Sequence, residues 1–222
     1  MIKLENLSKT FFKDSNKIEV LRGLNLEIKQ GESLAILGVS GAGKSTLIHI
    51  LGTLDHPTEG RLFINGVNVF EWEEKKIANF RNCTIGFIFQ LNNLLPEFTA
   101  LENAMMPALI SGMNKKQALE KANYLLSEVG LGHRVKHKPG ELSGGEQQRV
   151  AIARSLIMDP EILLADEPTG NLDTETGKKI EDILVNLNET KNITLIVVTH
   201  NKMLAERMSG RIGLRDGKIY DY

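Results

Sequence analysis

The chain has 222 residues, 41% of them hydrophobic and 25% charged, which is enough for one large domain with a buried core and excludes a disordered protein. Its 27 basic and 28 acidic residues leave a net charge of -1, so we expect neither nucleic acid nor an anionic lipid surface as a direct partner. The single cysteine, Cys83, and the lack of an apolar leader segment indicate a reducing, cytoplasmic compartment. No apolar run approaches the roughly 20 residues that cross a bilayer, so we expect no direct membrane insertion.

Two kinds of strand pattern occur along the chain. Apolar and polar residues alternate at 2–4 and 24–28, and Asn65-Gly66 is typical of a tight hairpin turn, so these segments predict an antiparallel β layer. Nearly continuous apolar runs are typical of buried parallel strands, and three are present: Ile85–Phe89, Ile162–Ala165 and Thr194–Val198. The predicted fold class is therefore α/β, with a mixed sheet core beside the antiparallel layer.

Residues 38–46 fit the phosphate-loop pattern G-x-x-x-x-G-K-[ST] and follow the apolar run Leu34–Leu37. Glycines allow successive backbone N–H groups to curl around anionic oxygens. We expect Lys44 to contact the β- and γ-phosphates of a nucleoside triphosphate and Ser45 to offer its hydroxyl to Mg²⁺. A helix from Thr46 to Leu51 should direct its positive dipole end at the same phosphates. The predicted ligand-binding residues of this phosphate loop are Gly38, Val39, Ser40, Gly41, Ala42, Gly43, Lys44, Ser45 and Thr46.

The pattern between residues 91 and 160 is mainly helical. Asn114 and Gln117 resemble a capping box, an apolar stripe runs from Ala118 to Val129, and Gly130 is placed to end that helix. This stretch predicts a helical insert in the α/β domain.

A second helix start lies at Ser143, where Ser143 and Glu146 have the spacing of a capping box and the helix should run to Met158. Gly144 and Gly145 follow the cap, so we expect the N–H groups of the first turn to accept a phosphate group from outside. A capping box on its own is usually only a structural feature, so this interpretation depends on the rest of the site.

Two carboxylates follow the apolar strand 162–165, at the end where ligands of open α/β sheets bind. Asp166 suits a Mg²⁺ ligand, acting through water. Glu167 is placed to orient, or take a proton from, the water that attacks the γ-phosphate.

Six segments in this order resemble the ATP-binding cassette (ABC) ATPases, the motor subunits of ABC transporters, over nearly the whole chain. They are the phosphate loop, Gln90 as the Q-loop glutamine, Leu142–Glu146 as the signature, Asp166-Glu167 as the Walker B pair, Asn171–Asp173 as the D-loop, and His200 as the switch histidine.

The resemblance implies a homodimer that encloses two ATP molecules, each between the phosphate loop of one subunit and the signature of the other. It implies catalytic roles for Lys44, Gln90, Glu167 and His200, and Gln90 as a further Mg²⁺ ligand. It also implies an ABC-type P-loop fold: one domain over 1–222, with a nucleotide-binding core at 1–90 and 161–222 and a helical subdomain at 91–160.

Two positions depart from the usual pattern of the family. The signature ends in Glu146 where glutamine is commoner, and a carboxylate near a triphosphate is mildly unfavourable unless the capping box holds it. The aromatic residue that stacks on adenine would be Phe11, or Phe12 as the weaker choice, although either is equally an ordinary core residue.

Within the family, residues 94–107, 144–146 and 168–173 look like the lipoprotein-releasing branch and its macrolide-exporter relatives. This implies two integral membrane subunits as partners and a peripheral position on the cytoplasmic side of the inner membrane, with release of lipoproteins toward the outer membrane. The alternatives are a macrolide- or peptide-type exporter, a cell-division complex, an amino-acid importer cassette, and a repair or translation ATPase of another class. Four apolar residues either line a groove for the membrane subunits or pack in the core: Leu94, Leu95, Met105 and Met106.

Overall fold

A computed structural model describes residues 1–13 and 16–222. Its first layer is an antiparallel sheet in the order β2-β1-β4-β5, as the alternating pattern predicted. Asn65 and Gly66 form the predicted hairpin turn with φ of 51° and 78°, the left-handed conformation that such turns require. The strands are β1 (Ile2–Lys13), β2 (Asn16–Ile28), β4 (Glu59–Ile64) and β5 (Val67–Asn68).

The second layer is a six-stranded sheet in the order β10-β9-β3-β8-β7-β6, parallel except for the edge strand β10. The side chains of β3 and β8 are buried throughout, because layers cover both faces of the sheet. The strands are β3 (Ser33–Leu37), β6 (Ile85–Ile88), β7 (Ile162–Asp166), β8 (Thr194–Val198), β9 (Gly210–Arg215) and β10 (Lys218–Asp221).

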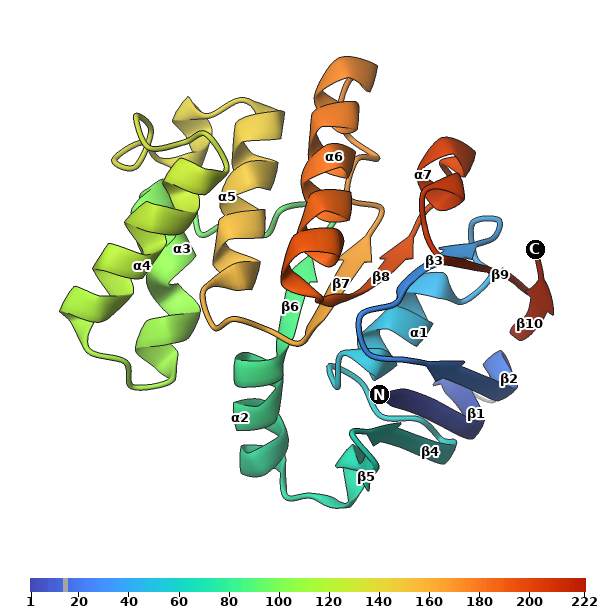
Figure 1. Cartoon of the computed structure of the whole chain (residues 1–222). Helices are drawn as coiled ribbons and strands as arrows, with labels where there is room; N and C mark the ends of the chain where they lie inside the picture. The colour runs from blue at the N-terminus through green and yellow to red at the C-terminus, as the bar shows by residue number, and fades with distance from the viewer. Residues whose placement is uncertain (14–15) are drawn as a thin grey trace.

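Helix α1 (Lys44–Leu51) lies between the two sheets (Figure 1). Its Leu47 and Ile48 join one apolar core with Leu4 and Leu62 of the antiparallel sheet and Ile196 of the parallel sheet. The helix begins two residues earlier than the predicted Thr46, because Gly43 (φ 98°) already turns the chain into the helix. The N-terminal end of α1 therefore lies within the phosphate loop.

The other face of the parallel sheet is covered by helices, with α5 and α6 against the sheet and α3 and α4 stacked outside α5 (Figure 1). A second apolar core fills this layer. Across the described residues, none of the helices is both long and apolar enough to span a bilayer. The remaining helices are α2 (Glu74–Thr84), α3 (Ala100–Ile110), α4 (Lys115–Glu128), α5 (Gly144–Leu156), α6 (Thr174–Lys191) and α7 (Lys202–Glu206), with single turns at Val69–Glu71 and Pro139–Glu141.

Three further details differ from the sequence predictions. Asn114 caps α4 by accepting from the backbone N–H of Lys116, so the predicted capping box with Gln117 is wrong. Helix α5 stops at Leu156 instead of Met158, because Asp159 takes a left-handed φ of 50° and turns the chain toward β7. Strand β6 ends at Ile88, one residue short of the predicted Phe89.

Candidate functional site

The carboxyl ends of β3, β8, β7 and β6 lie side by side, because these strands are adjacent and parallel. The phosphate loop follows β3, His200 follows β8, Asp166 and Glu167 lie at the end of β7, and Gln90 follows β6. These segments surround one cavity of about 520 Å³. Its lining is Val20, Gly38, Val39, Ser40, Gly41, Gly43, Lys44, Ser45, Thr46, Gln90, Asp166, Glu167 and His200.

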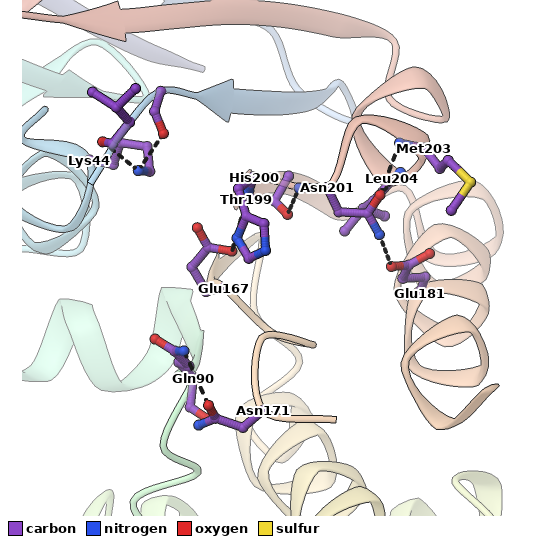
Figure 2. Close-up of polar contacts among 12 residues, drawn as sticks. Lys44, Gln90, Glu167, Asn171, Glu181, Thr199, His200, Asn201, Met203 and Leu204 are labelled. Carbon is purple, nitrogen blue, oxygen red and sulfur yellow. Dashed lines mark hydrogen bonds and ion pairs between the residues drawn. The ribbon is translucent and has the colours of Figure 1, made fainter. Parts of the chain in front are cut away.

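The phosphate loop has the conformation that its glycines predicted. Gly41 and Gly43 have φ of 81° and 98°, and a Cβ at Gly43 would lie 2.9 Å from the carbonyl oxygen of Val20. The Lys44 ammonium donates to the carbonyl oxygens of Gly38 (2.8 Å) and Val39 (3.0 Å), which keeps its charge over the loop (Figure 2). Since no side chain caps α1 and its first turn carries no acidic residue, its N-terminal N–H groups and positive dipole end suit phosphate oxygens.

Asp166 is suited to a cation. Its Oδ1 atom is buried and has no hydrogen-bond partner among residues 1–13 and 16–222, which is costly for a carboxylate unless a cation or water satisfies it. Ser45 and Gln90 line the same cavity. A carboxylate, a hydroxyl and an amide oxygen are ligands that Mg²⁺ prefers, so the residues present fit this ion.

Glu167 and His200 form a hydrogen-bonded pair across the ends of β7 and β8 (Figure 2). The Glu167 Oε2 atom accepts from the ring Nδ1 of His200 at 2.8 Å and from its backbone N–H at 3.3 Å. The Glu167 side chain is 17% exposed, whereas that of His200 is 73% exposed. Glu167 also has a left-handed φ of 46°, which is strained for a residue with a side chain. The carboxylate is thus held at the cavity, where it can contact a water molecule.

Gln90 is joined to the segment that follows Glu167. Its Nε2 atom donates to Asn171 Oδ1 at 3.3 Å, and Asn171 Nδ2 donates to the Gln90 carbonyl oxygen at 3.2 Å (Figure 2). A Cβ at Gly170 would lie 2.9 Å from Gln90 Nε2, so the small residue permits this approach. The family resemblance assigns Gln90 to the Q-loop and Asn171 to the D-loop, but it does not predict this direct contact.

The signature lies on a different part of the surface. Ser143 Oγ accepts from the Glu146 N–H at 3.3 Å and Glu146 Oε2 accepts from the Ser143 N–H at 2.8 Å, which confirms the predicted capping box. Ser143 and Gly144 are exposed. Gly145 is buried, and a Cβ there would lie 2.2 Å from Thr176 Cγ2, so its glycine is needed for packing against α6 rather than for access to the helix end.

Ala42 of the phosphate loop does not line the cavity and belongs to the core, and two further sets of predicted residues lie away from the cavity. None of Ser143, Gly144, Gly145 and Glu146 lines it; Gly144 instead lines a separate hollow of about 360 Å³. Phe11 is 42% exposed and Phe12 is 73% exposed, so neither is a core residue, and Val20 is the residue of the antiparallel sheet that does reach the cavity. The alternating segments 2–4 and 24–28 do not include Val20, so its position at the cavity was not predicted.

The four apolar residues expected in a groove or in the core are divided by the structure. Met105 is 4% exposed and belongs to the core, and Leu94 packs partly buried against the same core. Leu95 is 42% exposed, and Met106 is half-buried in a shallow hollow beside Phe98.

A buried carboxyl group supports the loop that carries His200. Glu181 of α6 is 7% exposed, and its Oε1 atom accepts from Asn201 Nδ2 at 2.8 Å (Figure 2). Asn201 in turn caps α7 through the N–H of Met203, and its own N–H donates to Thr199 Oγ1. Burial raises the pKa of the Glu181 carboxyl above its ordinary value, partly offset by the bond from Asn201.

Glu181→Gln should therefore stabilise the chain at neutral pH, by about 1 kcal/mol or less. The raised pKa means that the folded state loses stability as the pH rises from the ordinary value through the folded one, because a charge must then be buried. Glutamine keeps the acceptor for Asn201 and removes that loss. Thermal unfolding at pH 4 and pH 8 should show the gain only at the higher pH. Glu175→Gln, at an exposed position of the same helix, should show no such pH-dependent gain.

The fold and this cavity define a P-loop nucleoside triphosphatase. The comparisons with known proteins narrow this class. Residues 21–170 match the model of the ABC transporter family. The chain is 72% identical to the "Lipoprotein-releasing system ATP-binding protein LolD" of Syntrophus aciditrophicus, over 99% of this chain and 98% of that protein. It is 50% identical to the protein of the same name from Geobacter metallireducens, over 99% and 97%.

Solved structures agree with this likeness. The dimeric structure of MJ0796, described as a bacterial ABC transporter cassette, matches with a TM-score of 0.92 and 43% identity, covering 99% of this chain and 96% of that one. A dimeric post-hydrolysis state of MJ0796 bound to ADP and Pi matches with the same score and 42% identity. The chain belongs to the ABC transporter family and is the ATP-hydrolysing subunit of an ABC transporter.

Proposed function

We propose that this chain is the motor that drives release of lipoproteins from the inner membrane toward the outer membrane. The observation that carries the proposal is the 72% identity, along almost the whole of both chains, to a protein named as the ATP-binding subunit of a lipoprotein-releasing system. Seven further relatives of that name match at 48–51% identity. The exporter, cell-division, importer and repair or translation alternatives have no comparable support.

In the proposed mechanism two copies of the chain enclose ATP between them. The phosphate loop of one copy would hold the triphosphate, and Ser143, Gly144 and the first turn of α5 in the other copy would contact its γ-phosphate. The support is that the two surfaces lie apart on one subunit and that the related MJ0796 structures are dimeric. The helical segment 91–160 would carry the signature as a subdomain, on a core made of 1–90 and 161–222.

Within one site, each residue has a separate task. Lys44 would balance the β- and γ-phosphate charge, and Ser45, Gln90 and Asp166 would hold Mg²⁺, which draws charge from the phosphate oxygens when bound. Glu167 would accept a proton from the attacking water as its oxygen approaches phosphorus. His200, which donates to Glu167, would hold that carboxylate in place and present its ring to the γ-phosphate.

The membrane partners are proposed to be two integral subunits, LolC- and LolE-like, which place this chain peripherally on the cytoplasmic side of the inner membrane. A hollow of about 510 Å³ bounded by α2, β6, α3 and α5 offers them an apolar contact surface. Phe87, Pro107, Ile110 and Met158 line it, and it is separate from the nucleotide cavity.

Lys44→Ala should weaken ATP binding by about 100-fold, because losing charge-assisted hydrogen bonds to phosphate costs about 3 kcal/mol. Titration with a fluorescent ATP analogue measures this directly. Lys179→Ala, which removes an exposed lysine of α6, should bind as tightly as the parent chain. Equal affinity of the Lys44 variant and the parent would exclude Lys44 from the triphosphate site.

Reconstitution tests lipoprotein release. The chain would be co-purified with its membrane subunits, placed in vesicles with a fluorescent lipid-anchored protein, and given ATP together with a soluble lipoprotein acceptor. Transfer of fluorescence to the acceptor, lost in the Lys44→Ala complex, supports the proposal. ATP hydrolysis that moves a macrolide but never the lipid-anchored protein would contradict it.

A further inference from the structure

The signature carries its own negative charge at the place proposed to meet a phosphate. Glu146 is the third residue of α5, its side chain is 17% exposed, and its Oε2 atom is occupied by the Ser143 N–H at 2.8 Å. The other oxygen, Oε1, is not used by the capping box. A carboxylate at this position repels an incoming triphosphate unless a positive charge compensates it.

Arg134 supplies a positive charge beside this carboxylate. Its Nε atom lies 3.2 Å from Glu146 Oε1, and its Nη1 atom donates to the ring Nε2 of His137 at 3.1 Å. Because arginine can only donate, the Nε2 atom of His137 is the acceptor of this bond. The Nε–H of Arg134 is buried and forms no aligned hydrogen bond within the described part of the chain, so its contact with Glu146 is one of charge. The Ser143 N–H bond, helped by the charges of Arg134 and Arg149, holds the pKa of Glu146 below its ordinary value.

The loop that carries Arg134 is fixed to the rest of the helical layer. The carbonyl oxygens of Val135 and His137 accept from the N–H groups of Leu101 and Ala100, at 3.0 and 2.8 Å, in the first turn of α3. The N–H of His137 donates to the Arg134 carbonyl oxygen at 2.9 Å. The guanidinium therefore sits on a braced loop and not on a free surface segment, which reduces the entropy lost when it holds its position.

We propose that Arg134 is a positioning residue for ATP-dependent dimerisation: it neutralises Glu146, so that the start of α5 can receive the γ-phosphate held by a second copy of the chain. His137 holds the guanidinium in place by accepting a hydrogen bond from its Nη1 atom. This inference rests on the proposed function, since it assigns a role at the proposed trans contact. If the ion pair had only a structural role, it would add little to the stability of the fold, and its loss would not change dimerisation.

A double-mutant cycle separates these two roles. The chain would carry Glu167→Gln throughout, so that hydrolysis does not dissolve the dimer, and the ATP concentration for half-maximal dimerisation would be measured by analytical ultracentrifugation. Arg134→Ala should raise that concentration about tenfold, because the carboxylate would then repel the γ-phosphate without compensation in a partly buried site. In the Glu146→Gln background the same change should raise it less than twofold, because no charge remains to be neutralised.

Three further variants keep the test informative. Arg134→Lys keeps the positive charge and should dimerise at close to the ATP concentration that the parent needs. Arg134→Gln keeps a polar side chain without the charge, so it should raise that concentration about as much as Arg134→Ala, and it replaces the alanine variant if that variant folds poorly. Arg207→Ala is the matched control, since Arg207 is about as exposed (35% against 37%) and forms a 2.8 Å ion pair with Asp182 away from the signature. It should leave dimerisation unchanged.

The outcomes distinguish this inference from the proposed dimer. The role of Arg134 would be overturned if Arg134→Ala had the same effect with Glu146 present as in the Glu146→Gln background, or had no effect in either. The proposed dimer would not be affected by that result. A parent chain that binds ATP yet stays monomeric would overturn the dimer and this inference together. ATP affinity of the monomer, measured with the fluorescent analogue, should be the same for Arg134→Ala and the parent, because Arg134 lies outside the nucleotide cavity.

Discussion

Replacing Glu167 with glutamine should lower ATP turnover by about 10²–10⁴-fold while leaving ATP binding intact, since a positioned general base contributes a factor of that size. Glutamine has the same shape and keeps an oxygen that accepts from His200 Nδ1, so the loop should retain its conformation. ATP that is bound and not hydrolysed should accumulate a stable dimer. Steady-state phosphate release gives the rate, and size-exclusion chromatography with ATP gives the dimer.

Glu161→Gln is the matched control for this prediction. Glu161 precedes the other end of β7, and it accepts from Asn65 Nδ2 at 3.0 Å, a bond that glutamine can also accept. Its variant should turn over ATP at the parent rate. Wild-type turnover in the Glu167 variant would remove Glu167 from the mechanism.

Ser143→Arg should abolish ATP-dependent dimerisation and turnover, because the new side chain places bulk and charge where the γ-phosphate would enter. The monomer should still fold, since losing the cap costs about 1 kcal/mol. Its ATP affinity should match the parent, because Ser143 does not line the nucleotide cavity. Ser143→Ala loses the same cap without filling the space, so its dimerisation should fall much less.

Mixing two inactive variants gives the sharper version of this test. A dimer of one Ser143→Arg chain and one Lys44→Ala chain contains one complete site, made from the phosphate loop of the first and the signature of the second. An equal mixture should therefore hydrolyse ATP faster than either variant alone. No recovery on mixing, with both variants folded, would contradict a site shared between two chains.

Much of the architecture could be predicted from local patterns. The phosphate loop, the Asn65-Gly66 turn and the capping box at Ser143 each depend on contacts within a few residues, so the sequence carries them directly. The fully apolar runs placed three strands of the parallel sheet for the same reason. Because parallel strands end at one edge, the sequence also placed Asp166 and Glu167 near the phosphate loop.

The contacts between distant segments could not be predicted in this way. The bonds that join Gln90 to Asn171, the packing of Gly145 on Thr176, and the pairing of Arg134 with Glu146 each connect residues that only the fold brings together. No periodicity identifies such partners. Small errors at helix ends have a different cause, since a single left-handed residue such as Asp159 ends a helix that the apolar pattern would continue.

Glu167 has a left-handed backbone conformation, and hydrogen bonds to the neighbouring strand hold that backbone in place. Its N–H donates to the Val198 carbonyl oxygen at 2.9 Å, its own carbonyl accepts from Gly170 at 3.0 Å, and Asp166 pairs in register with Val198 of β8. Moving the backbone of Glu167 away from the cavity would require breaking these backbone hydrogen bonds. Slippage of β7 against β8, even when caused by repacking deep in the apolar interior, would therefore slow the chemical step while nucleotide still binds.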